Sequence, residues 1–131
     1  AHRAAQTAVE ARLKEAGLPP LAWYDALLEL ERAGADGLRP FELQREMLFA
    51  QYNLSRLIDR LVAAGYVVRS ASAEDGRGQV LGLTREGRAM RKRMWPVYAA
   101  AIEDAVGRHL SLAEATTLAD LLGRLYSRPT K

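Results

Sequence analysis

Apolar residues recur at helical spacing between residues 51 and 65, and the rest of the chain is organised around this segment. The apolar positions are Leu54, Leu57, Ile58, Leu61 and Val62. They follow the i, i+3, i+4, i+7, i+8 spacing of a helix with one buried face. The remaining positions are polar or charged, and two amide side chains stand in or next to the first turn. A helix that reads base edges in the major groove needs such donors and acceptors there, although an ordinary surface helix with a solvated face shows the same pattern.

The same reading predicts the elements on either side of this helix. Glycine and proline at 17–20, and glycines at 34–37, separate two helices before it. After Gly65 the apolar period changes from 3.6 to about 2, which indicates strands. The expected elements are helices at 1–17, 21–33, 41–47 and 51–64, strands at 66–72 and 79–83, and helices at 85–107 and 111–126. Residues 38–39 are expected to be a short link or a strand of one or two residues, and Pro96 is expected to kink the long helix. The fold class is mainly α with a small β-hairpin.

Two short helices at 41–47 and 51–64, joined by a tight turn, are typical of a helix-turn-helix. The residues expected to cap them are Arg39 and Ala50, where Ser or Thr would be usual. The hairpin that follows would then be the wing of a winged helix. Its turn carries Arg77, which can enter the narrow minor groove of DNA, and Asp75, which can hold the guanidinium. A generic solvated hairpin is the alternative interpretation.

Composition narrows the functional classes. The 131 residues suit one domain, and 49% hydrophobic content argues against a disordered chain. The chain has no cysteine and only two histidines, so thiol redox chemistry is excluded and no metal site is expected. No run is long and apolar enough to cross a membrane, and no signal-peptide pattern opens the sequence. We therefore expect a cytoplasmic protein, and because it begins at Ala1, part of the native N-terminus is expected to be missing.

The net charge of +3 is unevenly distributed. Residues 38–93 hold eleven Arg and Lys against six Asp and Glu, whereas residues 1–37 hold four against six and residues 94–131 hold four of each. This basic centre suggests a polyanionic partner, although scattered solvated charge also fits a surplus of this size. Asp25, Glu29 and Glu31 are interpreted as the solvated face of their helix. We expect no catalytic site, no cofactor and no enzymatic activity.

Five short segments, in this order, resemble the MarR family of bacterial transcriptional regulators. They are residues 40–43 (Pro-Phe-Glu-Leu), 54–61 (Leu-Ser-Arg-Leu-Ile-Asp-Arg-Leu), 65–69 (Gly-Tyr-Val-Val-Arg), 74–77 (Glu-Asp-Gly-Arg) and 83–88 (Leu-Thr-Arg-Glu-Gly-Arg). The resemblance covers residues 38–93 closely. It implies a homodimer that binds palindromic operator DNA, usually as a repressor, and that in many members is released by a small aromatic or phenolic anion.

The resemblance also divides the single domain of residues 1–131. It implies a winged helix-turn-helix lobe at 21–93 and dimerisation helices at 1–16 and 94–131. Together with the pattern, it predicts these DNA-binding residues: Gln51, Tyr52, Asn53, Ser55, Arg56, Arg60, Arg69, Asp75 and Arg77. Ser55, Arg60 and Arg69 are expected to contact phosphates or brace the wing, with an Asp59–Arg60 pair and an Arg69–Asp75 pair as alternatives. The predicted effector residues are Trp23, Tyr24 and Arg88. The competing hypothesis is a winged-helix module that binds protein and no DNA.

Overall fold

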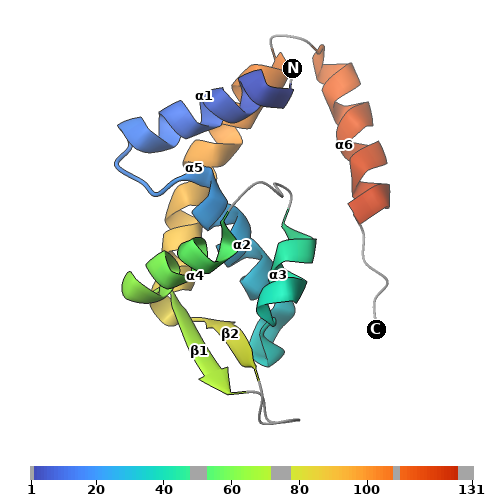
Figure 1. Cartoon of the computed structure of the whole chain (residues 1–131). Coiled ribbons are helices and arrows are strands. Elements are labelled where there is room, and N and C mark those ends of the chain that lie inside the picture. The colour runs from blue at the N-terminus through green and yellow to red at the C-terminus, as the bar shows by residue number, and fades with distance from the viewer. Residues whose placement is uncertain (1, 48–52, 72–77, 108–109, 127–131) are drawn as a thin grey trace.

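The computed structural model describes the backbone of residues 2–47, 53–71, 78–107 and 110–126, and the side chains within these ranges except at 2–6, 105, 106, 119 and 122–126. Figure 1 shows its elements, which in chain order are α1 (His2–Glu15), α2 (Leu21–Ala33), the 3₁₀ turn η1 (Gly34–Asp36), α3 (Pro40–Glu46), α4 (Leu54–Ala63), β1 (Val67–Ala71), β2 (Gln79–Leu83), α5 (Arg85–Gly107) and α6 (Leu112–Tyr126). The predicted fold class, mainly α with one hairpin, is confirmed. In the described part of the chain, no helix combines the length and the apolar character that a bilayer crossing requires.

Helix α2 forms the centre of the core. It packs against α1, α3, α4, α5 and β2, and its Leu27 and Leu30 are fully buried. Fully buried leucines also come from α1 (Leu13), α3 (Leu43) and β2 (Leu81). Because these apolar side chains come from every neighbouring element, a single core holds the helix-turn-helix, the hairpin and the long helix together.

The prediction that α2 has a solvated acidic face was wrong for two of its three residues. Asp25 and Glu29 are 4% and 5% exposed, whereas Glu31 is partly exposed. Helices on several sides of α2 cover even its polar positions. A buried carboxylate needs a partner, and Glu29 accepts a hydrogen bond from Arg32 Nη1 at 3.0 Å.

The chain leaves α4 through a tight helix end that directs it into the hairpin. Gly65, at φ +83°, donates to the Val62 carbonyl at 3.0 Å, and Tyr66 N donates to the Leu61 carbonyl at 3.0 Å. This pair of bonds is the Schellman arrangement, which favours glycine at the left-handed position. β1 and β2 then pair antiparallel with Val67 opposite Leu83 and Arg69 opposite Leu81. Leu38 adds an isolated bridge to Leu81, so of the two alternatives expected at 38–39, a short link or a very short strand, the structure shows the second.

Helix α5 begins at a junction with the end of α4. Thr84 caps α5, because its Oγ1 accepts from Gly87 N at 3.0 Å, and the same hydroxyl donates to the Gly65 carbonyl at 2.6 Å. Thr84 N donates to the Tyr66 carbonyl at 3.1 Å. The helix runs on through Pro96 to Gly107. Its far half packs against α1, whereas α6 stands apart from the lobe formed by α2, α3 and α4 (Figure 1).

Candidate nucleic-acid interface

Helix α4 is amphipathic, and its packing fixes which side faces solvent. Leu57, Ile58 and Leu61 are buried, and the helix packs against α2, α3 and β1. These contacts hold one side of α4 in the core, so its opposite side stays toward solvent. The exposed side carries the polar residues Ser55, Arg56, Asp59 and Arg60.

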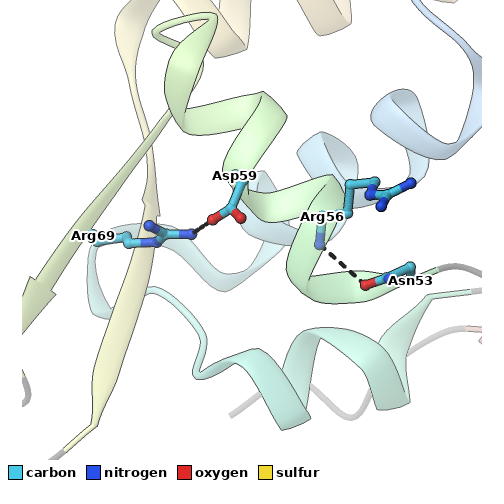
Figure 2. Close-up of polar contacts among 4 residues, drawn as sticks. All are labelled: Asn53, Arg56, Asp59 and Arg69. Atoms are coloured by element: carbon cyan, nitrogen blue, oxygen red, sulfur yellow. Dashed lines mark hydrogen bonds and ion pairs between the residues drawn. The ribbon is translucent and has the colours of Figure 1, made fainter.

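Asn53 caps this helix, and the helix therefore begins later than predicted. Its backbone is extended (φ −73°, ψ 96°), and its Oδ1 accepts a hydrogen bond from Arg56 N at 3.2 Å (Figure 2). We expected this helix to start at residue 51 and to lack a proper cap, and both expectations were wrong. Asn53 stays outside the helix because its side chain can then accept a hydrogen bond from an N–H of the first turn. At α3, Arg39 N donates to Glu42 Oε1 at 2.9 Å, so a first-turn carboxylate supports that helix start.

Because Asn53 is both a cap and a candidate base contact, two variants should separate the roles. Asn53→Ala removes the acceptor and should lower the free energy of unfolding by about 1 kcal/mol. Asn53→Ser keeps an oxygen that can cap the helix but removes the amide donors. We expect Asn53→Ser to unfold in urea near the wild-type midpoint while its preference among DNA sequences relaxes. A uniform loss of affinity across all sequences would argue against base recognition by Asn53.

The structure brings together part of the predicted DNA-binding set. Ser55, Arg56 and Arg60 lie with Asn53 on the exposed side and N-terminal end of α4. The predicted residues Gln51, Tyr52, Asp75 and Arg77 lie outside the described residues, so their roles stay predictions.

Arg69 has a partner that the sequence did not predict, and the expected pair with Asp75 lies outside the described residues. Its guanidinium on β1 forms an ion pair with Asp59 on α4, and Figure 2 shows the two side chains directed toward each other. Asp59 therefore pairs across to the hairpin, not with Arg60 beside it on the helix. This contact links the candidate recognition helix to the first strand of the hairpin.

A second candidate site lies where α2 meets α5. The ring of Tyr24 stacks on that of Tyr98, with centroids 4.8 Å apart, and the Trp95 ring lies 5.9 Å from Tyr98. Arg91 Nε donates to Glu31 Oε1 at 2.6 Å, and the Arg91 guanidinium lies near the Tyr24 phenol. Burial raises the pKa of the Tyr24 phenol, and the Arg91 guanidinium offsets part of that rise. Burial likewise raises the pKa of Tyr98, so both phenols stay protonated near neutral pH.

The structure does not assemble the three predicted effector residues into one site. Tyr24 joins this aromatic cluster, but Trp23 packs edge-on against Tyr66, with centroids 6.0 Å apart, and Arg88 is exposed on α5. Sequence reasoning missed Arg91, Trp95 and Tyr98. Their i, i+4, i+7 spacing places them on one side of a helix, and that signal was available. Among the described residues, no group of three or more acidic or histidine side chains is arranged to hold a metal ion.

Comparison with known sequences agrees with this architecture. A sequence model of the MarR family matches residues 16–78, which span α2, the helix-turn-helix and the start of the hairpin. The HTH-type transcriptional regulator PrsX of Escherichia coli is 35% identical over 71 residues, which are 54% of this chain and 43% of PrsX. The chain therefore aligns with less than half the length of that curated relative.

Solved structures share the fold over almost the whole chain. Wild-type MarR from E. coli in its apo form superposes with a TM-score of 0.79 at 23% identity, covering 96% of this chain and 91% of that one. Sco3205 from Streptomyces coelicolor, a MarR family transcriptional regulator solved in complex with DNA, gives a TM-score of 0.75 at 25% identity over 95% of this chain and 78% of its own. The family match, the ordered motifs and the winged-helix geometry agree in placing the similarity of this chain with the MarR family.

Proposed function

We propose that this protein is a transcriptional regulator that binds operator DNA through α4. The observation that carries the proposal is the exposed, polar start of α4, where Asn53, Ser55 and Arg56 lie together on a helix held rigidly by its buried leucines. A helix supported in this way can place its first turn in the major groove. Sco3205, which has the same fold, was solved in complex with DNA, and this supports DNA binding as the function.

The hairpin is proposed to act as a wing beside α4. β1 and β2 extend from the α4–α5 junction as an antiparallel pair (Figure 1). Arginine in such a turn suits the negative potential of the minor groove. Arg77 remains our proposed minor-groove contact, with Asp75 as its support.

A second copy of the chain is the proposed partner of α6. Leu112, Leu118 and Leu121 of this helix are 86%, 40% and 50% exposed, and α6 packs only lightly on α5. Leu118 and Leu121 are three residues apart and share one side of α6, and an exposed apolar side of a helix indicates a surface that another protein covers. A homodimer formed through α1, α5 and α6 would carry two copies of α4, which suits a palindromic operator and repression by occupancy.

The aromatic cluster between α2 and α5 is the proposed effector site, and it would take a small phenolic or aromatic anion. The half-exposed Trp95 and the partly exposed Tyr98 offer ring surfaces stacked on the buried Tyr24, and Arg91 offers a guanidinium for the charge. In a Trp23→Phe background Trp95 is the one remaining tryptophan. We expect 4-hydroxybenzoate to quench its fluorescence saturably, and Arg91→Gln to weaken that binding by about tenfold.

Glu31→Gln is the matched control for the effector experiment, since it removes the ionic partner of Arg91 but keeps the guanidinium. It should bind 4-hydroxybenzoate at least as well as the parent protein. Equal losses in Arg91→Gln and Glu31→Gln, or quenching that never saturates, would argue against an anion site here.

The DNA-binding proposal is tested by selecting duplexes from a random-sequence library and measuring the affinity of the best one across a salt series. We expect a palindromic sequence whose binding weakens steeply as salt rises, because phosphate contacts release counterions. No enrichment at low salt would overturn the proposal. The exposed α4 face and hairpin would then be a protein-binding surface.

A further inference from the structure

The strand register explains why Arg69 reaches the recognition helix. Val67 and Arg69 are two residues apart on β1, so their side chains leave the same face of the hairpin. Val67 is buried, and Leu81, which pairs with Arg69, is fully buried. Val68, on the opposite face, is 52% exposed. Arg69 therefore starts from the inner face of β1, which packs against α4, and its guanidinium emerges beside Asp59.

Asp59 lies on the same exposed side of α4 as Ser55 and Arg56. Its side chain is 66% exposed, and that of Arg69 is 39% exposed. A lone carboxylate on a surface that faces DNA would repel the phosphates, so this position is unfavourable for a DNA-binding helix. The Arg69 guanidinium neutralises the carboxylate where it stands, and in doing so it ties the second turn of α4 to β1.

We propose that the Asp59–Arg69 ion pair is a brace that sets the position of the wing relative to the recognition helix, and that Arg69 is a positioning residue, not a phosphate contact. The inference rests on the proposed DNA-binding function. An exposed ion pair contributes little to stability. Its effect should therefore show in how the wing meets DNA, with little change in whether the protein folds.

The test uses two double variants of the full chain that both keep the wild-type net charge. Asp59→Asn/Arg69→Gln removes the ion pair, and Asp59→Arg/Arg69→Asp exchanges its ends. Each is measured against a duplex selected by the wild-type protein and against a mixed-sequence duplex, by fluorescence anisotropy. Hydroxyl-radical footprinting reports the flanks of the selected site, where the wing would lie, and urea unfolding reports stability.

If the ion pair is a brace, the Asp59→Asn/Arg69→Gln variant should bind the selected duplex about three- to fivefold more weakly than wild type. It should also lose protection at the flanks of the site. The exchanged pair should stay within about twofold of wild type, with its flanking protection kept. If Arg69 contacts a phosphate, both double variants lose affinity equally, since both remove the cation at position 69, and the inference is overturned.

Lower stability with unchanged affinity and footprint would also overturn the inference, because the pair would then be structural only. If the wild-type protein binds neither duplex at low salt, the proposed function itself fails and the inference falls with it. If the wild-type protein binds DNA but the two double variants have equal affinities and equal footprints, the brace is overturned while the proposed function stands.

Discussion

Replacing Gly87 with alanine should lower the free energy of unfolding by about 2–4 kcal/mol. An added Cβ at this position would lie 2.2 Å from the Tyr66 carbonyl oxygen and 2.8 Å from Leu83 Cδ1. The closer neighbour is backbone, so it cannot move aside as the end of a flexible side chain could. The hairpin base and the start of α5 would have to separate.

The loss of stability in Gly87→Ala should exceed that of a simple steric overlap, because the Tyr66 carbonyl already accepts a hydrogen bond. It accepts from Thr84 N at 3.1 Å, and Thr84 Oγ1 in turn accepts from Gly87 N. Moving the carbonyl away from a new methyl group strains both bonds at once. The same shift would displace β1 relative to α5, so weaker DNA binding should accompany the lower stability.

Gly82→Ala is the matched control in the same hairpin. Its added Cβ would lie 3.5 Å from Val68 Cγ1, an ordinary contact. Alanine in a strand also loses less conformational entropy on folding than glycine, so we expect a change between zero and a gain of about 0.5 kcal/mol. Urea unfolding of the two variants measures the difference. If Gly87→Ala proved as stable as Gly82→Ala, the close approach of Tyr66 to α5 would be wrong.

The elements of the fold could be predicted because the signals are local. The five apolar positions of α4 follow one helical stripe, and Leu57, Ile58 and Leu61 are indeed buried. The change of period after Gly65 likewise located β1 and β2. The start of α4 was misplaced by three residues, because the pattern cannot show whether Asn53 continues a helix or caps it.

The contacts of the candidate sites were harder to predict, since they join distant segments. Asp59 and Asp75 both lay within sequence reach of Arg69 and both had the right charge. The strand register, which sets Arg69 on the inner face of β1, brings it to Asp59, whereas Asp75 lies outside the described residues. In the same way, the pairing of Glu31 with Arg91 spans 60 residues, and no spacing rule connects them.

The buried acids of α2 illustrate the same limit. A carboxylate in a sequence is read as solvated because isolated buried charge is so unfavourable. Asp25 and Glu29 are nevertheless buried, since α2 is covered by elements that arrive from both ends of the chain. Burial of polar groups is thus a property of the assembled packing, which the local pattern of one helix does not contain.

Removing both arginines from the exposed side of α4 should have the largest effect on DNA binding. Arg56 and Arg60 are exposed and one helical turn apart, so both can face the same duplex. Each alanine variant should cost about 1–3 kcal/mol of binding free energy, and the double variant about 2–5 kcal/mol. Since about 1.4 kcal/mol is a factor of ten, the double variant should bind a selected duplex roughly 30- to 4,000-fold more weakly.

The two single variants should fail in different ways. Arg56 is the nearer to the capped start of α4, where base edges are read, so Arg56→Ala should reduce the ratio of selected to mixed-sequence affinity. Arg60, a turn further along, is expected at the phosphates. Arg60→Ala should weaken both duplexes alike and reduce the salt slope by about one. Lys14→Ala on α1 removes the same charge away from α4 and controls for net charge. If Lys14→Ala matched either arginine variant, the losses would reflect total charge, and the α4 surface would not be the site that meets DNA.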